Sequence, residues 1–379
     1  MFDKFKVIKN NGLIQLVASN MFAYSIFGIF WFFLARYLGP EEYGEISYFF
    51  AIATVAVSVS TVGLQSGVAV FSSTEPKTEN SFLTLGLILS LIAAVISFVL
   101  FSHIEVSLLI VGSSFFGLSI YAALGKKEYS KFSLLTIQQK ISSITFALIL
   151  YYFIGLEGIL LGLAIGYLLL SKGMYNLILK RNLELSQIRP KIKFITNNYI
   201  SESTHNLVWW SDRFILLPLY GFTFLGNYQL GMHILQMMCV FPFIFYQYLL
   251  PNDSTGTTNN NIRLLAVSIS IILSIFVFFF GPQIVEFLFP EYDYVIEFIP
   301  IFSLSLIPIT INLIFSSYFL GKKKAKVIAI SNVLLLTVQL VLAFIFGSVL
   351  NSSSLMPYAI LIAFISQTIF LLIAKIKNV

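Results

Sequence analysis

Polar side chains of several kinds gather in the segment NYISESTHNLVWWSDRF, residues 198–214, which runs into the apolar stretch ILLPLY. At about 3.6 residues per turn, six of them share one face of a helix: Glu202, His205, Asn206, Trp209, Asp212 and Arg213. A guanidinium group binds anions, an indole ring can stack on a sugar, and imidazole exchanges protons near neutral pH. The face therefore combines the groups needed to hold an anionic molecule and to move a proton.

Two interpretations of this face stay open. Polar side chains inside hydrocarbon are costly and usually face a bundle interior or an aqueous cavity. In the first interpretation the face is a cavity wall, where Arg213 and Trp209 contact an anionic or sugar-bearing molecule. Glu202, His205 and Asp212 are then candidates for coupling to an ion. In the second, the charges form an internal salt bridge that locks helices together.

Weaker polar signals lie in two other apolar segments. Gln229, His233 and Gln236 follow an i, i+4, i+7 spacing. They predict either contact with a ligand in a cavity or hydrogen bonds between helices. Lys140 lies about two turns inside its apolar segment. Its ammonium can reach the cytoplasmic interface along its own stem, or it can contact a phosphate that enters from the inner leaflet.

Arg36 belongs to the stretch ARYLGPEEYG, residues 35–44, which follows a long apolar run. Pro40 suits the first turn of a helix, and the acidic Glu41 and Glu42 favour its positive end. The stretch therefore predicts a tight outer hairpin between two spans. Arg36 is interpreted either as a structural cation at the end of the first span or as a contact for an anion.

The composition indicates a solvent other than water around most of the chain. Of the 379 residues, 58% are hydrophobic and 11% are charged, whereas soluble domains carry about 25% charged residues. This predicts an all-α polytopic membrane protein, because lipid can solvate such a surface. The single cysteine excludes a disulfide framework within the chain. The absence of a phosphate-binding loop motif and of a catalytic or metal-ligand cluster predicts a protein that is not an enzyme and has no cofactor or metal.

Apolar runs of about 20 residues are long enough to cross a bilayer. About twelve such spans are expected at residues 12–35, 45–71, 81–101, 105–124, 132–154, 156–178, 197–219, 223–250, 263–283, 297–320, 326–349 and 355–374. They divide into an N-terminal six-helix bundle (1–180), a cytoplasmic linker (181–196) and a C-terminal six-helix bundle (197–379). With this count, nearly all Lys and Arg residues fall on the side of both termini, which the positive-inside rule makes cytoplasmic. The net charge of +6 needs no nucleic acid as a partner, because attraction to anionic membrane lipid is enough to account for it.

The two halves repeat each other weakly. YAALGKK (121–127) matches YFLGKKK (318–324), and GPEEYGEISY (39–48) matches GFTFLGNY (221–228). The second pair shares G-x-x-x-x-G followed by tyrosine. The two halves keep the same orientation, which predicts a relation by an axis along the membrane normal.

Three segments carry a resemblance to a known family: FLARYLGPEEYGEISYFFAIATVAVSVSTVGL (33–64), WWSDRFILLPLYGFTFLGNYQLGMHIL (209–235) and LFPEYDYVIEFIPIFSLSLIPITINLIFSSYFLGKKKAK (288–326). They resemble the polysaccharide biosynthesis exporters, the O-antigen (Wzx-type) flippases. The superfamily of these proteins, which comprises the multidrug, oligosaccharidyl-lipid and polysaccharide exporters, also includes lipid II flippases.

The resemblance implies two six-helix bundles around a central cationic cavity in the bacterial cytoplasmic (inner) membrane. Such a protein moves an oligosaccharide unit linked to a polyprenyl diphosphate, such as undecaprenyl diphosphate, to the outer leaflet for O-antigen lipopolysaccharide or a similar surface polysaccharide. Its partners would include the polymerase and the chain-length components. The candidate anion contacts are Arg213, Lys140 and Arg36, and the candidate sugar-stacking rings are Trp209, Trp210 and Tyr24.

Two other functions are weighed against this one. A multidrug cation antiporter of the same fold would use an acidic cavity, for which Glu202 and Asp212 are candidates. A membrane glycan polymerase or ligase usually carries a large outer loop with basic residues. The short acidic outer loops predicted here argue against the second alternative.

Overall fold

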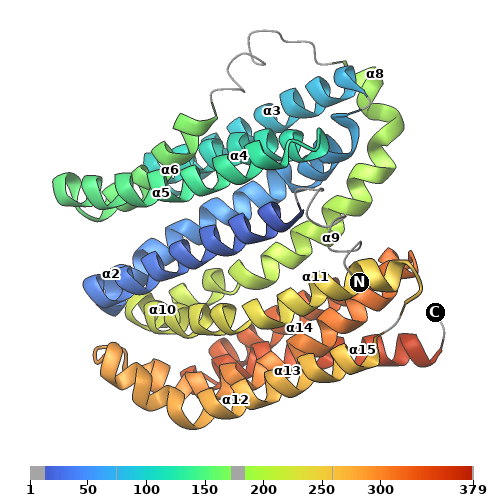
Figure 1. Cartoon of the computed structure of the whole chain (residues 1–379). Helices are drawn as coiled ribbons and strands as arrows, with labels where there is room; N and C mark the ends of the chain where they lie inside the picture. Colours follow the sequence, from blue (N-terminus) through green and yellow to red (C-terminus); the bar gives the residue numbers. More distant parts are fainter. Residues whose placement is uncertain (1–12, 74, 172–183, 258, 378–379) are drawn as a thin grey trace. The chain divides into compact units, whose positions relative to one another are not determined.

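The computed structural model describes residues 13–73, 75–171, 184–257 and 259–377. Within these ranges the chain is helical and contains no strand (Figure 1). The predicted all-α class is therefore confirmed. Nine of the described helices are long and apolar enough to cross a membrane, which supports a multi-pass membrane protein.

The N-terminal helices follow the predicted spans closely. Their bounds are α2 (Leu13–Phe71), α3 (Pro76–Phe101), α4 (Ile104–Gly125), α5 (Tyr129–Ile154) and α6 (Leu156–Leu170). Helix α2 contains the first two predicted spans, and it consists of two helices joined at Gly39. The linker region contains the short α8 (Leu185–Ile188) and a 3₁₀ turn (Arg189–Lys191). The last residues of the sixth predicted span lie outside the described residues.

The C-terminal helices differ more from the predicted spans. Their bounds are α9 (Ile192–Trp210), α10 (Arg213–Met238), α11 (Val240–Ser254), α12 (Asn260–Leu288), α13 (Asp293–Gly321), α14 (Ala325–Phe344) and α15 (Met356–Ile376). The predicted seventh and eighth spans are each interrupted, at Ser211–Asp212 and at Cys239. A π-helical turn (Ile345–Val349) extends α14, and a 3₁₀ turn (Ser353–Leu355) precedes α15.

The segments that match between the two halves of the sequence also agree in local structure. Gly39 and Gly221, the first glycines of the two G-x-x-x-x-G motifs, have φ angles of 75° and 77°. Only glycine adopts this region readily, so each motif can join two helices at this point. Within the other matched pair, Lys127 and Lys323 both have a φ of 60°. The backbone N–H groups of these two lysines bond to Leu124 and Leu320 respectively, at the same spacing.

The chain divides into two compact units. Unit 1 contains residues 1–30 and 49–203, and unit 2 contains residues 31–48 and 204–379. The core of unit 1 includes the buried Val68, Phe82 and Leu118. The core of unit 2 includes Tyr228 and Phe302. The bundle boundaries predicted from the sequence, 1–180 and 197–379, remain a prediction.

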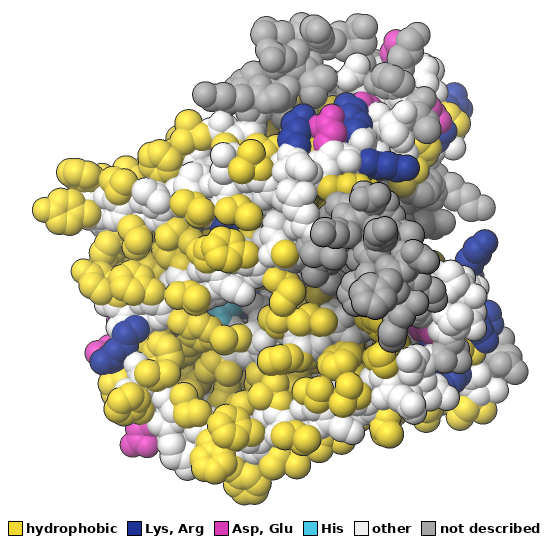
Figure 2. All heavy atoms as spheres, in the orientation of Figure 1, with side chains coloured by type: hydrophobic (Ala, Val, Ile, Leu, Met, Phe, Trp, Pro, Cys, Tyr) yellow, Lys and Arg dark blue, Asp and Glu magenta, His cyan; other side chains and the backbone are white. Residues whose placement is uncertain are grey.

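Helices α5 and α6 of unit 1 pack closely through a line of small residues. A Cβ atom at Gly162 would lie 2.2 Å from the backbone nitrogen of Ala147, and one at Gly166 would lie 2.2 Å from the hydroxyl of Ser143. Small residues at four-residue spacing allow such close contact of helices in lipid. Exposed apolar side chains cover much of the remaining helical surface, as Figure 2 shows for one face.

An ion pair outside the membrane-crossing helices ties the start of α3 to the linker. Glu75 accepts hydrogen bonds from Thr78 Oγ1 (2.7 Å) and from Lys191 Nζ (3.0 Å). The Lys191 ammonium also lies 4.3 Å from the centre of the Phe71 ring. The bond from Thr78, followed by the bond from Lys191, lowers the pKa of Glu75. These bonds favour the ionised carboxylate.

This lowered pKa predicts a pH-dependent contribution to the stability of unit 1. The contribution is present above the ordinary carboxyl pKa and is lost as the pH falls through the lowered value. Glu75→Gln should therefore lower Tm slightly, by about 1–2 °C, at neutral pH. It should have no effect in acid strong enough to protonate Glu75. Thermal unfolding in detergent measures both values, with the exposed Glu157→Gln as the control. A Tm difference that persists at low pH would contradict the assignment.

Candidate functional site

A buried network of polar side chains lies in unit 2 around Arg213, the first residue of α10. Arg213 is 0% exposed and the adjacent Asp212 is 1% exposed. Nη1 of Arg213 donates to Asp212 Oδ1 (3.0 Å) and to the carbonyl of Trp209 (2.6 Å). Its Nε donates to Gln229 Oε1 (2.7 Å). The cation is thus paired and hydrogen-bonded, which a buried charge requires.

The carboxylate of Asp212 is equally well satisfied. Its other oxygen accepts from the hydroxyl of Tyr228 (2.6 Å) and from Nε2 of Gln339 (3.2 Å). Asp212 therefore bonds to residues of α10 and α14 as well as to its neighbour Arg213. Neither charge of the pair is available to an outside ligand in this conformation.

The network continues from Gln229 to a histidine and a tyrosine. Nε2 of Gln229 contacts Nε2 of His233 at 2.7 Å, and the hydroxyl of Tyr43 contacts Nδ1 of His233 at 2.5 Å. The Gln229 oxygen faces Arg213, so its amide nitrogen must donate to His233 Nε2. Because Nε2 of His233 accepts this bond, it carries no proton. The imidazole is therefore neutral, and its proton is assigned to Nδ1, which faces the Tyr43 hydroxyl. The ring of Trp31 covers His233, with ring centres 5.4 Å apart.

The same side chains donate hydrogen bonds to backbone carbonyls at the break between α9 and α10. In a continuous helix, the carbonyls of Val208 and Trp209 would accept from the N–H groups four residues later. Here the Val208 carbonyl accepts from Gln339 Nε2 (2.9 Å), and the Trp209 carbonyl accepts from Arg213. Unsatisfied backbone groups are costly at membrane depth. The network therefore makes an interrupted helix possible without glycine or proline at the break.

The two tryptophans of the predicted sugar-stacking set are half-buried in unit 2. The Arg213 guanidinium carbon lies 4.6 Å from the centre of the Trp210 ring. The Trp209 ring packs on Phe364 of α15 at 6.0 Å. Both indoles thus have protein partners, and sugar stacking by them remains a prediction.

Three predicted residues belong to unit 1, whereas this network belongs to unit 2. Glu202 is half-buried and accepts a hydrogen bond from the hydroxyl of Ser66. Lys140 is half-buried, and its Nζ lies 3.8 Å from the centre of the Phe27 ring and 5.7 Å from that of Tyr167. Tyr24 is 67% exposed.

Three further predicted residues complete the set. Arg36, in unit 2, is exposed three residues before the Gly39 kink. Gln236 is half-buried on α10. The side chain of His205 lies outside the described residues. The structure thus unites Asp212, Arg213, Gln229 and His233, which belong to two separately predicted polar faces.

Sequence reasoning missed Tyr43, Tyr228 and Gln339. Gln339 carried a usable signal, because it is the one amide within the apolar run VLLLTVQLVLAF (333–344). Tyr228 follows the second G-x-x-x-x-G motif, and Tyr43 lies inside the first. The spacing of these tyrosines gave no indication that one would meet an aspartate and the other a histidine.

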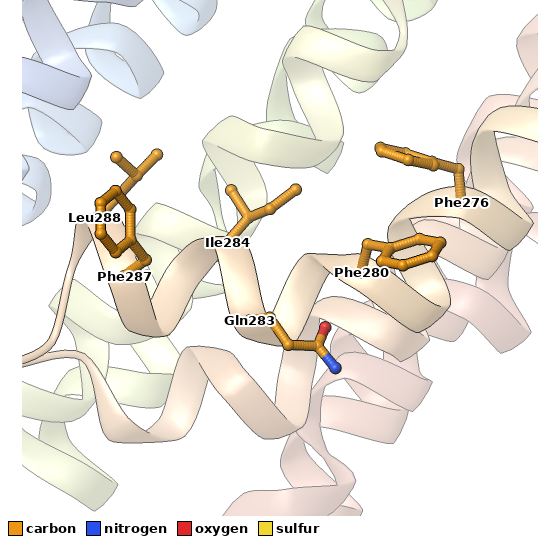
Figure 3. Close-up of a pocket in the computed structure, with 6 residues that line it drawn as sticks. All are labelled: Phe276, Phe280, Gln283, Ile284, Phe287 and Leu288. Atoms are coloured by element: carbon orange, nitrogen blue, oxygen red, sulfur yellow. The ribbon is translucent and has the colours of Figure 1, made fainter.

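The described surface also carries hollows away from this network. One has a volume of about 370 Å³ and is lined only by residues of α12. Figure 3 shows its side chains, which are apolar apart from Gln283. Among the described residues, no three His, Cys, Asp or Glu side chains are placed to hold a metal ion.

No family model matches the chain, and no curated protein matches it in sequence. Solved structures do match it. A multidrug resistance MATE family transporter of the MOP superfamily, in an inward-facing conformation, has a TM-score of 0.70 with 17% identity and covers 97% of this chain and 98% of its own. The chain therefore has the fold of these solved transporters, and the family named in the resemblance remains a prediction.

Two further structures show how widely this fold is shared. The lipid II flippase MurJ, in an inward closed conformation, has a TM-score of 0.79 with 15% identity and covers 96% of this chain and 87% of its own. A MOP-superfamily transporter from Pyrococcus furiosus has a TM-score of 0.61 with 18% identity and covers 98% and 95%. The description of that transporter states that the reverse polarity of its binding pocket suggests a different function.

Proposed function

We propose that this protein is a transporter, not an enzyme, and that it moves a lipid-linked oligosaccharide carried on a polyprenyl diphosphate across the membrane. The observation that carries the proposal is the environment of Lys140. Its half-buried ammonium lies over the rings of Phe27 and Tyr167. Among the described residues it forms no ion pair. A cation held by aromatic rings keeps its charge available for a diphosphate.

The chemistry of the cargo fits this arrangement. A diphosphate with sugars must cross hydrocarbon, where a single charge costs about 2.5–3.5 kcal/mol even on an insertion scale. A cation along the path offsets that cost, while the lipid tail remains in the bilayer. Arg36, which is exposed, is a second candidate contact. Alternating access would be rocking of one half against the other.

The buried network offers no free carboxylate to a cationic cargo. A multidrug cation antiporter would need a free carboxylate. Asp212 is occupied by Arg213, Tyr228 and Gln339. Glu202 favours the antiporter as a second candidate, because it is half-buried and accepts its hydrogen bond from the neutral hydroxyl of Ser66.

The remaining parts of the proposal follow from the resemblance. The protein would lie in a bacterial inner membrane with both termini cytoplasmic. It would supply O-antigen or a similar surface polysaccharide, together with a polymerase and chain-length components. Arg213 would support the path from inside unit 2, since its guanidinium is already saturated.

Complementation of a bacterial strain that lacks its own lipid-linked oligosaccharide flippase tests the proposal. We expect the wild type to restore surface glycan and Lys140→Ala to reduce its rate of appearance about tenfold, as for loss of a hydrogen bond to a charged group. Lys140→Arg should retain most of the activity. Lys131→Ala is the matched control on α5, since Lys131 is exposed and pairs with Glu128 at 2.9 Å.

The two candidate functions give different results in the same cells. Loss of a flippase leaves lipid-linked single units inside the cell, whereas loss of an antiporter makes cells sensitive to cationic drugs. Normal glycan from a well-expressed Lys140→Ala protein would remove Lys140 from the path. Drug sensitivity without any glycan defect, reproduced by Glu202→Gln, would replace the proposal with the antiporter.

A further inference from the structure

A second hollow lies in unit 2 where α12 begins and where α13 and α15 end. Its volume is about 320 Å³, and it is lined by residues of these three helices. At one end lie Arg263, Tyr318 and Lys375. The rest of the lining includes the apolar Leu264, Val267 and Ile314. The hollow thus has a cationic end and an apolar body.

The cationic end carries more positive charge than its own carboxylate balances. Nη2 of Arg263 is paired with Asp253, which also accepts the hydroxyl of Ser317. The Nζ of Lys375 lies 5.2 Å from the centre of the Tyr318 ring. Lys322 donates to the Tyr318 hydroxyl at 2.6 Å. Asp253 therefore compensates one of three neighbouring cations.

One hydrogen-bond donor at this end has no acceptor in the described part of the chain. Among the described residues, Nε of Arg263 is buried and has no hydrogen-bond partner. The side chain as a whole is 14% exposed. A buried donor left without an acceptor costs free energy, so an acceptor from outside the chain would be favoured. The positive end of α12, whose first residue Asn260 also lines the hollow, adds to the attraction for an anion.

The apolar body points to a ligand with a hydrocarbon chain. Leu264 is 68% exposed and borders the hollow. Neighbouring positions on α12 also expose large apolar side chains, among them Leu265 and Ile272. A cationic end followed by an apolar body matches a lipid whose phosphate lies at the membrane surface and whose acyl chains extend into the bilayer. The basic residues place this end on the predicted cytoplasmic side.

We propose that this hollow binds an anionic phospholipid of the surrounding leaflet. The phosphate would accept from Lys375 Nζ and from Arg263 Nε, which would turn from its buried position toward the hollow, and one acyl chain would lie along Leu264 and Val267. Basic pockets between membrane helices on the cytoplasmic side bind acidic headgroups in this way. The bound lipid would join the ends of α12, α13 and α15. The inference is independent of the transported substrate.

The test uses the full-length protein, purified and depleted of lipid in a neutral detergent. Phosphatidylglycerol, phosphatidylcholine or undecaprenyl phosphate is then added, and Tm and bound lipid are measured by thermal unfolding and native mass spectrometry. We expect phosphatidylglycerol to raise Tm in a concentration-dependent manner. Phosphatidylcholine should not. Protection by undecaprenyl phosphate alone would overturn the phospholipid assignment in favour of a substrate contact.

Two lysines provide a matched pair of variants. Lys375→Gln should weaken phosphatidylglycerol binding about tenfold, whereas Lys377→Gln, with the same change of charge on an exposed residue outside the lining, should leave it unchanged. Arg263→Lys keeps a cation for Asp253 but removes Nε, and should also weaken binding. If Lys375→Gln and Lys377→Gln weaken phosphatidylglycerol binding equally, the effect comes from general surface charge and the proposal is overturned.

Discussion

Replacement of Arg213 by methionine is expected to lower the unfolding free energy of unit 2 by about 3–5 kcal/mol, the usual cost of breaking a buried ion pair. The reason is that Asp212, which is 1% exposed, would remain charged without its cation. The Trp209 carbonyl would also lose its donor at the break between α9 and α10. Thermal unfolding in detergent and the fraction of monodisperse protein on size exclusion measure this loss.

A double-mutant cycle separates the pair from the rest of the network. Asp212→Asn should also destabilise the protein, because it leaves the Arg213 guanidinium buried without a counter-charge. The double variant Arg213→Met with Asp212→Asn should be less destabilised than the sum of the two single variants. Additive losses would show that the two charges do not interact as the 3.0 Å contact indicates.

The same variants distinguish the two interpretations that the sequence left open. If Arg213 serves as a direct contact for the substrate, Arg213→Met should fold normally and lose transport. If it serves as an internal salt bridge, as its complete burial indicates, stability should fall first and transport should fall with it. An Arg213→Met protein with the wild-type Tm would contradict the structural role.

The sequence predicted those features that depend on local pattern. The long apolar runs predicted the helices, and the stretch GPEEYG predicted the turn between the first two spans, where Gly39 joins two helices. The polar faces containing Arg213 and His233 could be recognised from helical spacing. Their contact through Gln229 could not, since a helical period shows which residues share a face but not what that face meets.

Long-range contacts account for what the sequence did not predict. Ser211 and Asp212 offer no breaking signal, and the break depends on Gln339 from α14. The inclusion of residues 31–48 in unit 2 likewise depends on distant partners. The Tyr292 hydroxyl donates to the Ala35 carbonyl at 2.6 Å, and Tyr43 reaches His233 across 190 positions of sequence.

Gly226→Val is expected to cause the other large effect. The two G-x-x-x-x-G motifs pack against each other inside unit 2 at their last glycines. A Cβ atom at Gly226 would lie 1.8 Å from the Pro40 carbonyl oxygen, and one at Gly44 would lie 2.0 Å from the Phe222 carbonyl oxygen. These neighbours are backbone atoms of a packed helix, which cannot move aside as the end of a flexible side chain can. The cost should therefore reach or exceed the upper end of the usual range for overpacking, about 1–3 kcal/mol.

Gly28→Ala is the matched control, because it also adds a Cβ atom to a glycine of α2 but meets nothing within 4 Å. It should leave Tm unchanged or raise it, since alanine is favoured over glycine within a helix by about 0.5–1 kcal/mol. A fall in Tm with Gly28→Ala similar to that with Gly226→Val would show that helical glycines matter here for some other reason than close packing.

Comparison with Tyr43→Phe identifies what the glycine contact holds in place. Tyr43 precedes Gly44, so separation of the two motifs would also withdraw its hydroxyl from His233. Tyr43→Phe removes only that hydrogen bond and should cost about 0.5–1.5 kcal/mol. If Gly226→Val costs more, and adding Tyr43→Phe to it costs little further, the backbone contact positions the end of the buried network. Full additivity of the two losses would show that the contact and the network are independent.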